Sequence, residues 1–303
     1  VQPRRLYFDV APGLEAVLER ELQTLGVQSK PEFYRGGLVL EAPESILWRV
    51  ALESRVLQGA RLGVGTPFHA AYESTLCNYV AGIPWGDYMW FRTEAASPPI
   101  KVVAEKSRLY HSEVIERGVL NGIEEQRQRF LKSRLQRKQD DAFYGRPEKP
   151  RPPLPTIHVE LTKNECQLSV SVTEVPHPRA YPLALEPPEL AGLEAASKND
   201  AQGSAWLLGE SHAAACVLKT PIHRQLEEAA EAGQRLCIWD PFCGPGTLLL
   251  EALGIALGVP AASPAMQMPF QDFPGFDEVR FSEVVRMLQV TPHHAIGNLS
   301  LLG

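Results

Sequence analysis

Hydrophobic and polar positions over about the first 55 residues alternate between a strand-like and a helix-like pattern. Residues 6–10 are an apolar run that predicts a strand. From Pro12 to Gly26 the apolar positions recur with the helical period, which predicts a helix that ends at the glycine. A second apolar run, residues 38–40, and a second periodic segment that begins at Pro43 repeat this order. Strand, helix, strand, helix predicts a small α+β layer.

Residues 66–91 are dense in aromatic side chains but follow neither period cleanly. Such rings can stack on nucleic-acid bases, yet packing in the core between two subdomains is the favoured interpretation. The aromatic residues are Phe68, Tyr72, Tyr79, Trp85, Tyr88, Trp90 and Phe91.

Residues 100–172 predict a second module. It consists of a strand at 100–104, a helix that Ser112 can cap, and a hairpin of two alternating strands joined at residues 163–165. The turn between the first strand and the helix offers four side chains suited to phosphate. A loop of this kind beside a helix amino terminus is a natural phosphate cradle. The four residues are Lys106, Ser107, Arg108 and His111.

The chain is organised around residues 239–251, where an apolar run at 235–238 meets a glycine turn and an apolar helix. The pattern predicts a buried strand, a ligand loop and a helix. Gly244 and Gly246 let the backbone approach a ligand closely, and Asp240 can accept hydrogen bonds at the carboxyl end of the strand. A bare Gly-x-Gly is weak evidence for a cofactor site, since an ordinary strand-to-helix turn has the same pattern.

Composition narrows the class of protein. The chain has 303 residues, 44% hydrophobic and 22% charged, which suits two or three globular domains, and no apolar run reaches the roughly 18 residues of a membrane span. Five scattered cysteines without a Cys-x-x-Cys pair argue against a disulfide framework or a zinc site and for a reducing compartment. A start at Val1 rather than Met suggests a processed precursor or a fragment.

Positive charge is concentrated although the net charge is -6. Residues 127–151 carry nine Lys or Arg against three acids. This run is either a local nucleic-acid footprint or a solvated helix end that continues into a loop. Its basic residues include Arg127, Lys132, Arg134, Arg137 and Lys138.

The longer string Asp-Pro-Phe-Cys-Gly-x-Gly-Thr, which starts at Asp240, resembles the S-adenosylmethionine (SAM) loop of RNA guanine-N2 methyltransferases that carry a THUMP domain. Residues 107–111 look like part of the THUMP RNA-binding domain. Residues 11–15, Gly36-Gly37 and Pro84-Trp85 resemble the amino-terminal ferredoxin-like region of the bacterial large-subunit rRNA guanine-N2 methyltransferase. The likeness covers nearly the whole chain, in the order of that family.

Two further landmarks fit the same family. His177, Arg179 and Tyr181 match its exit from THUMP, although Ala180 and Pro182 depart from the usual glycine and arginine. Glu210 with the alanines that follow looks like the helix before the cofactor loop. The resemblance therefore implies a ferredoxin-like domain over 1–95, a THUMP domain over 96–181, a linker or insertion over 182–209, and a partial class I Rossmann-like methyltransferase domain over 210–303.

The resemblance also implies the site residues. SAM would be held by Asp240, Pro241, Cys243, Gly244, Gly246, Thr247 and Glu210, and RNA by Lys106, Ser107, Arg108, His111, Arg127, Lys132, Arg134, Arg137 and Lys138. Pro245 stands where the family often has serine and removes one N–H from the loop. No metal ligand is implied.

Pieces that the family needs for chemistry do not follow Asp240. These are an acidic residue for the cofactor ribose, a side chain beside the adenine, and an Asn/Asp-Pro-Pro-Tyr/Phe loop for the flipped base. Only 63 residues (303 minus 240) come after Asp240. Residues 294–303 can be the second strand in either of two registers, one of which puts Asn298 near the acidic position.

The expected function is SAM-dependent guanine-N2 methylation of large-subunit rRNA. The alternative is a catalytically inactive relative that serves as an RNA-binding structural or assembly component, for instance of a mitochondrial ribosome with ribosomal proteins as partners. A tRNA methyltransferase is a third interpretation, which the aromatic amino-terminal region disfavours. No membrane partner is expected, and the compartment is the cytoplasm or, slightly favoured, the mitochondrial matrix.

Overall fold

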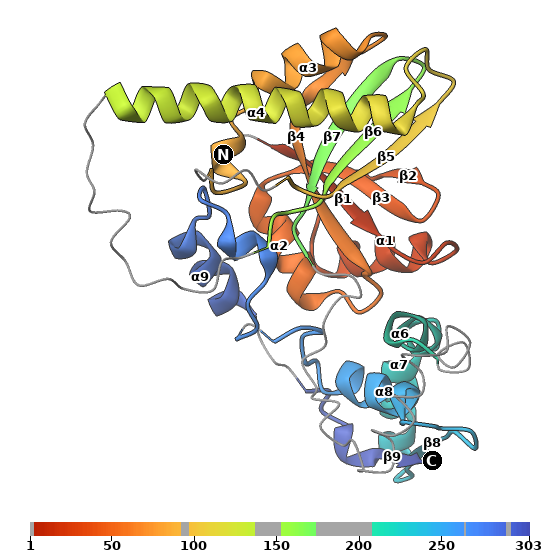
Figure 1. The fold of residues 1–303 in the computed structure, drawn as a ribbon. Coiled ribbons are helices and arrows are strands. Elements are labelled where there is room, and N and C mark those ends of the chain that lie inside the picture. The colour runs from red at the N-terminus through yellow and green to blue at the C-terminus, as the bar shows by residue number, and fades with distance from the viewer. Residues whose placement is uncertain (1–2, 92–96, 137–152, 174–207, 264, 289–291) are drawn as a thin grey trace. The chain divides into compact units, whose positions relative to one another are not determined.

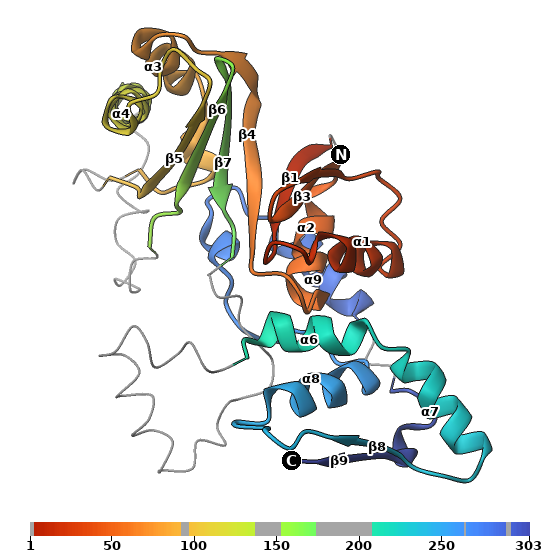
Figure 2. The ribbon, with the colours of Figure 1, turned by 90° about the vertical axis from the view of Figure 1, so that its right-hand side faces the viewer.

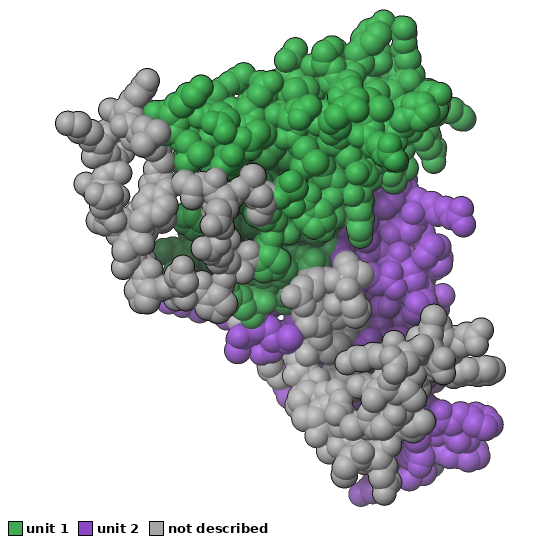
Figure 3. Space-filling view, in the orientation of Figure 1, with its two compact units in different colours: residues 1–7, 60–174, 267–279 green, residues 8–59, 175–266, 280–303 purple. Residues whose placement is uncertain are grey.

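The computed structural model describes residues 3–91, 97–136, 153–173, 208–263, 265–288 and 292–303, with the backbone alone described for 133–136. Over these residues the chain is a mixed α/β protein, as its sequence patterns predict (Figure 1 and Figure 2). It divides into two compact units (Figure 3). Unit 1 comprises residues 1–7, 60–174 and 267–279, and unit 2 comprises residues 8–59, 175–266 and 280–303.

Strands of the larger sheet follow the order β2-β3-β1-β4-β7-β6-β5, and a second sheet consists of β8 and β9. Their limits are β1 Arg4–Asp9, β2 Glu32–Tyr34, β3 Gly37–Ala42, β4 Gly59–His69, β5 Ile100–Glu105, β6 Ile157–Thr162, β7 Glu165–Ser171, β8 Leu236–Trp239 and β9 Leu299–Leu302.

Helices occupy the segments between these strands. Their limits are α1 Glu15–Thr24, α2 Glu44–Glu53, α3 Glu73–Ala81, η1 Trp85–Asp87, α4 Ser112–Gln136, α6 Glu210–Leu218, α7 Ile222–Glu231, α8 Thr247–Ala256, η4 Pro269–Asp272, α9 Glu278–Met287 and η5 Ile296–Asn298. Among the described residues, no helix is both long enough and apolar enough to cross a bilayer.

The amino-terminal pattern of strand, helix, strand, helix is confirmed by β1, α1, β3 and α2. Leu18 and Leu22 on α1 are buried, as the helical period predicts. The short β2 was not predicted. It has three residues and pairs antiparallel with β3, so its limits depend on a partner strand rather than on a local pattern.

The module predicted between residues 100 and 172 is also confirmed. The strands β5 and β6 are parallel because α4 lies between them in the chain, whereas β6 and β7 form an antiparallel hairpin. The hairpin turns at Lys163 and Asn164, whose φ angles of 53° and 68° are those of a tight two-residue turn. The helix α4 packs against α3.

Aromatic residues between 66 and 91 divide between the core and the surface. Trp85 and Tyr88 are buried, and the rings of Phe68 and Tyr79 stack 3.5 Å apart, which confirms the packing role expected of them. Tyr72 is 53% exposed and Trp90 is 41% exposed, however, and that expectation is wrong for these two residues.

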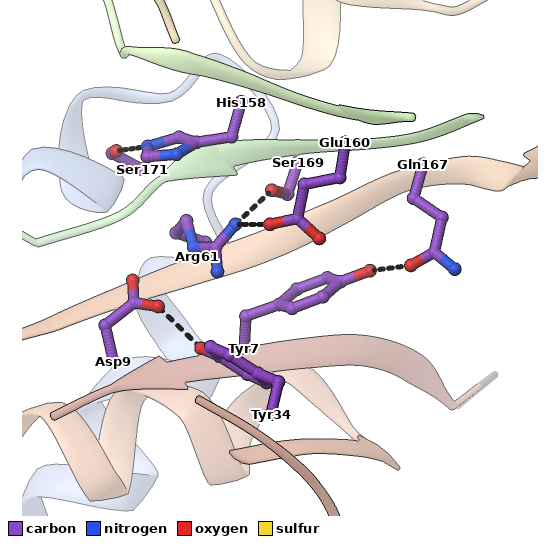
Figure 4. A network of polar contacts seen from close by, with 9 residues as sticks. All are labelled: Tyr7, Asp9, Tyr34, Arg61, His158, Glu160, Gln167, Ser169 and Ser171. Carbon is purple, nitrogen blue, oxygen red and sulfur yellow. Dashed lines mark hydrogen bonds and ion pairs between the residues drawn. The ribbon is translucent and has the colours of Figure 1, made fainter. Parts of the chain in front are cut away.

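Buried polar side chains on neighbouring strands of unit 1 satisfy one another (Figure 4). Arg61 on β4 donates to Glu160 Oε1 at 2.6 Å and to Ser169 Oγ at 3.4 Å. Its guanidinium also lies 4.8 Å from the centroid of the Tyr7 ring. The Tyr7 hydroxyl donates to Gln167 Oε1 at 2.7 Å. The network links the four strands β1, β4, β6 and β7 and leaves the buried Arg61 charge well compensated.

In unit 2 the strands β8 and β9 pair in parallel, and the helices α6, α7 and α8 lie toward one face of this pair (Figure 2). Leu236 and Ile238 pack on an apolar cluster from α6, α7 and α8, in which Leu226 and Ala252 are fully buried. Trp239 points away and is 71% exposed. The predicted strand is therefore present, but it is not buried, because only one of its faces is covered in the described structure.

Cysteine labelling tests the core of unit 1. Cys166 on β7 is fully buried, and this burial, together with the nearby Glu160 carboxylate, raises the pKa of the thiol to about 12. Cys216 and Cys237 are exposed. With iodoacetamide at about pH 8, mass spectrometry should find Cys216 and Cys237 modified and Cys166 modified only after urea is added. Equal labelling of the three thiols in the native protein would contradict this core.

Candidate cofactor loop and RNA-binding surface

The glycine loop begins where β8 ends and is held by its own backbone. The Asp240 N–H donates to Leu302 O at 2.9 Å, which extends the pairing of β8 with β9 by one residue. The Phe242 N–H then donates to Asp240 Oδ1 at 3.1 Å, and the Gly246 N–H donates to Cys243 O at 2.8 Å. The Asp240 backbone thus extends the strand pairing, and the Asp240 side chain stabilises the turn that follows.

Two glycines give the loop its shape. Gly244 has a φ of 52° and Gly246 a φ of 79°, which lie in the left-handed region that costs other residues free energy. Gly246 is the cap of α8, and Thr247 is the first helical residue. The N–H groups of that first turn have no carbonyl partner within the helix and are available to a ligand.

The loop is open to solvent. Gly244 is exposed, Asp240 is half-buried, and the Phe242 side chain is 92% exposed. A packed interior at this position would have excluded a ligand, and the structure rules out such packing for the described residues. The half-buried carboxylate of Asp240 and the two glycines leave the backbone of this loop accessible to a polar ligand.

The register of β9 decides between the two expected alternatives. Leu236 lies opposite Leu299 and Trp239 opposite Leu302, so the carboxyl ends of both strands meet at Asp240 and Gly303. Asn298 lies at the other end of the strands, where its Nδ2 donates to Gln234 O at 2.7 Å. The register that placed Asn298 near the cofactor ribose is therefore wrong.

Glu210 opens α6, the helix that packs against α8. Its side chain is half-buried. The next residue, Ser211, is 8% exposed and accepts a hydrogen bond from Gln58 Nε2 at 3.4 Å. The predicted supporting role of Glu210 stays a prediction.

A buried ion pair between α8 and Arg55 was not predicted from the sequence. Glu251, one turn after Thr247, has no exposed surface, and its Oε2 lies 2.8 Å from Arg55 Nη1. Arg55 also donates to Val259 O. The guanidinium fills the space beside Gly254, where an added Cβ would lie 2.7 Å from Arg55 Nη2. Glu251 stands out as a charged residue in an otherwise apolar helix, but nothing in the neighbouring sequence identifies Arg55 as its partner.

Glu21 completes this cluster from α1. Its carboxylate accepts the Arg55 backbone N–H at 2.9 Å and the Ser54 hydroxyl at 2.5 Å. Burial raises the pKa of Glu21 above the usual range, although these hydrogen bonds and the Arg55 charge oppose the shift. The α1 helix, the residues after α2 and the α8 helix are thereby joined through one arginine.

In unit 1, the predicted phosphate cradle is a tightly held loop. The Ser107 hydroxyl donates to Glu105 O at 3.0 Å and accepts the Asn164 N–H at 2.9 Å. The Arg108 N–H donates to Asn164 Oδ1 at 2.7 Å. Lys106 has a φ of 50°, which is unusual for a residue with a side chain. The turn of the β6–β7 hairpin therefore fixes the path of this loop.

Aromatic rings accompany the basic side chains of this loop. Arg108 Nη1 donates to the Tyr72 hydroxyl at 2.7 Å, and its guanidinium lies 4.5 Å from the Tyr72 ring centroid. The rings of Tyr110 and His111 are 4.1 Å apart, and Tyr110 is 64% exposed. Exposed rings beside cations suit nucleic-acid bases and phosphates together. Tyr72 was assigned to the core because no local pattern distinguishes an exposed ring from a buried one.

The basic run on α4 is only partly available. Arg127 pairs with Glu124 at 2.6 Å, and this contact lowers the pKa of the glutamate. Arg129 pairs with Glu125 at 3.2 Å. Lys132 is exposed. The side chain of Arg134 and the whole of Arg137 and Lys138 lie outside the described residues.

An α/β fold with a glycine loop after a strand that pairs in parallel defines a class of nucleotide- and cofactor-binding proteins. Comparison with known proteins narrows this class. Residues 5–58 match the model of the RlmL ferredoxin-like domain, which covers β1 to the end of α2.

Two curated relatives align over most of the chain. The protein named "Putative RNA methyltransferase slr0064" of Synechocystis is 28% identical over 90% of this chain and 60% of its own length. The Ribosomal RNA large subunit methyltransferase K/L of Syntrophotalea carbinolica is 26% identical over 89% of this chain and 32% of its own length. These matches confirm the resemblance to RNA methyltransferases related to the K/L enzyme. The chain spans less than two thirds of either relative.

A solved structure shows the same fold. SMU.472, named as "a putative methyltransferase complexed with SAH", superposes with a TM-score of 0.63 at 20% identity and covers 94% of this chain and 64% of the other. At this identity the likeness establishes the fold alone.

Replacing Arg55 tests the buried pair. Arg55→Ala leaves Glu251 buried without its partner and should lower the free energy of unfolding by about 3–5 kcal/mol, measured by urea denaturation. Arg224→Ala, which breaks the exposed pair of Arg224 with Glu228, is the control and should cost at most about 1 kcal/mol. The double variant Arg55→Met with Glu251→Leu should recover most of the loss. A double variant as unstable as Arg55→Ala would contradict this account.

Proposed function

We propose that this chain binds SAM at the loop of residues 240–247 and is part of an RNA methyltransferase. The observation that carries the proposal is the exposed turn with two left-handed glycines, Gly244 and Gly246, at the carboxyl end of β8. The relation to RNA methyltransferases and the SAH named with the similar fold support the choice of ligand. Bound SAM supplies an electrophilic methyl group on a sulfonium.

Each part of the loop has a role in this proposal. The first-turn N–H groups of α8 and the Asp240 carboxylate orient the cofactor, while Cys243 and Pro241 form the wall of the turn. Glu251 and Arg55 hold α8, so the loop does not have to be ordered by the ligand alone. These groups position a reactant, which is the main contribution expected of a protein in a displacement of this kind.

We propose large-subunit rRNA as the substrate and the guanine N2 amine as the methyl acceptor. The K/L relative is named for large-subunit rRNA, and the motifs of this chain resemble the guanine-N2 type. A THUMP domain at residues 96–181 would grip the RNA through the loop of residues 106–111. Tyr72 and Arg108 add a stacking surface to that loop.

The alternative is an RNA-binding assembly component without methyl transfer, for instance in a mitochondrial ribosome. The exposed Tyr72 ring and the Arg108 guanidinium beside it fit RNA binding with or without methyl transfer. Incubation of the full-length natural protein with large-subunit rRNA and methyl-labelled SAM distinguishes the two. Label in guanine N2 supports the enzyme, whereas RNA binding without label supports the assembly component. If the protein neither binds the RNA nor labels it, both proposals are wrong.

Substitution of Gly246 tests the cofactor loop. Gly246→Ala forces a side chain into the left-handed region and should weaken SAM binding about tenfold, a cost of roughly 1–2 kcal/mol. Binding to this chain should itself be weak, so saturation-transfer NMR is the suitable measurement. Gly258→Ala, with a φ of 63° at the other end of α8, is the matched control and should bind like the native protein. Equal effects of the two variants would refute the assignment.

Salt dependence of RNA binding tests the loop of unit 1. Arg108→Ala should weaken binding to a large-subunit rRNA fragment and reduce the slope of log K against log salt by about 1, since one phosphate contact is lost. Arg286→Ala removes an exposed arginine on α9 and should leave the slope unchanged. An unchanged slope in Arg108→Ala would argue against a phosphate contact at this loop.

A further inference from the structure

We propose that Glu227, His293 and His294 in unit 2 form a site for one divalent transition-metal ion, with Zn²⁺ the best match. Ligand atoms of Glu227, His293 and His294 all lie within 4.8 Å of one another. Among the described residues, these three form a group of possible metal ligands. His293 Nε2 lies 3.4 Å from Glu227 Oε1. The proposal does not depend on SAM or RNA binding.

The fold brings these residues together from two segments. His223 and Glu227 are four apart on α7 and therefore share one face of that helix. His293 and His294 precede η5, and the His293 backbone N–H is fixed by Ala256 O at 2.9 Å. The His293 ring stacks with that of His223 at 5.1 Å and with that of His294 at 4.6 Å. Two imidazoles and one carboxylate thus converge, and the His223 ring flanks them.

The chemistry of these donors selects the metal. Imidazole nitrogen and carboxylate oxygen together suit Zn²⁺, Ni²⁺ and Cu²⁺, whereas Ca²⁺ and Mg²⁺ prefer oxygen alone. Donor atoms around a tetrahedral zinc are roughly 3.4 Å apart, given bonds of about 2.0–2.1 Å. The cluster must therefore close by about an ångström. Glu227 and His294 are exposed, so rotation of their side chains can supply that movement.

One hydrogen bond competes with the metal. The Ala295 N–H donates to His293 Nδ1 at 3.2 Å, which places the proton of a neutral ring on Nε2. Coordination through Nε2 moves this proton to Nδ1 and ends that bond. At 3.2 Å the bond is at the long end of the normal range, and the new metal–nitrogen bond outweighs it.

The position of the site assigns it a structural role. It lies next to η5, at the amino ends of β8 and β9, whereas the cofactor loop begins at their carboxyl ends. A bound ion would join α7 to the segment that leads into β9. The ion would thus stabilise the strand pair without contact with the loop of residues 240–247.

Metal titration of the whole chain tests the site. After chelator treatment, Zn²⁺ should bind with one-to-one stoichiometry in competition with a chromophoric chelator, and it should raise the melting temperature. Glu227→Gln and His293→Asn should each weaken binding at least tenfold. Two neighbours that lie outside the cluster provide matched controls. Glu228→Gln on the same helix and His212→Asn on α6 should bind like the native chain.

Cobalt provides a second measurement that does not need a variant to fold. Co²⁺ in the native chain should give the intense visible absorption of a tetrahedral site with nitrogen and oxygen ligands. Native binding no tighter than that of Glu227→Gln and His293→Asn would overturn the proposal. So would a loss in the control variants as large as in these two, since binding would then reflect scattered surface histidines.

Discussion

The buried guanidinium of Arg55 is the constraint on which unit 2 depends. An isolated charge in an interior is prohibitively costly, so Arg55 is tolerable only with Glu251 and the Val259 carbonyl in contact. Its own backbone N–H is taken by Glu21. These partners come from α1, from α8 and from the segment after α8. Packing that separates any of them would leave charge or hydrogen-bonding capacity unsatisfied, which restricts unit 2 to one arrangement.

The same contact bears on the glycine loop. Glu251 lies four residues after Thr247, so the ion pair fixes α8 one turn from the point where the loop delivers its N–H groups. Gly254 belongs to this arrangement because any side chain there would displace the guanidinium. Further along the chain, Ala262 donates its N–H to Leu52 O, and Phe281 packs edge-on against Trp48 at 5.9 Å. Contacts with the ferredoxin-like layer therefore fix the helix that follows the glycine loop, and the loop itself can remain open to solvent.

Local pattern was enough to predict the parts of the fold that neighbouring residues determine. The helical period of α1, the alternation of β6 and β7, and the glycine turn at Gly244 were all readable from the sequence. Contacts between distant residues were not. Arg55 and Glu251 are 196 positions apart, and neither carries a mark of the other. The exposure of Trp239 likewise depends on how many strands adjoin β8, which its own four residues do not encode.

Charge distribution on α4 shows why a basic run is an imprecise guide to a binding surface. The sequence count treats all nine basic residues between 127 and 151 alike, but Arg127 and Arg129 are paired with glutamates one turn earlier on the helix. An arginine held in such a pair must give up its partner before it can take a phosphate, and it gains correspondingly less. Arg108 differs because its partner is the neutral Tyr72, which orients the guanidinium without cancelling its charge. Orientation by an exposed ring, rather than the density of positive charge, is what favours the 106–111 loop as the proposed surface for RNA.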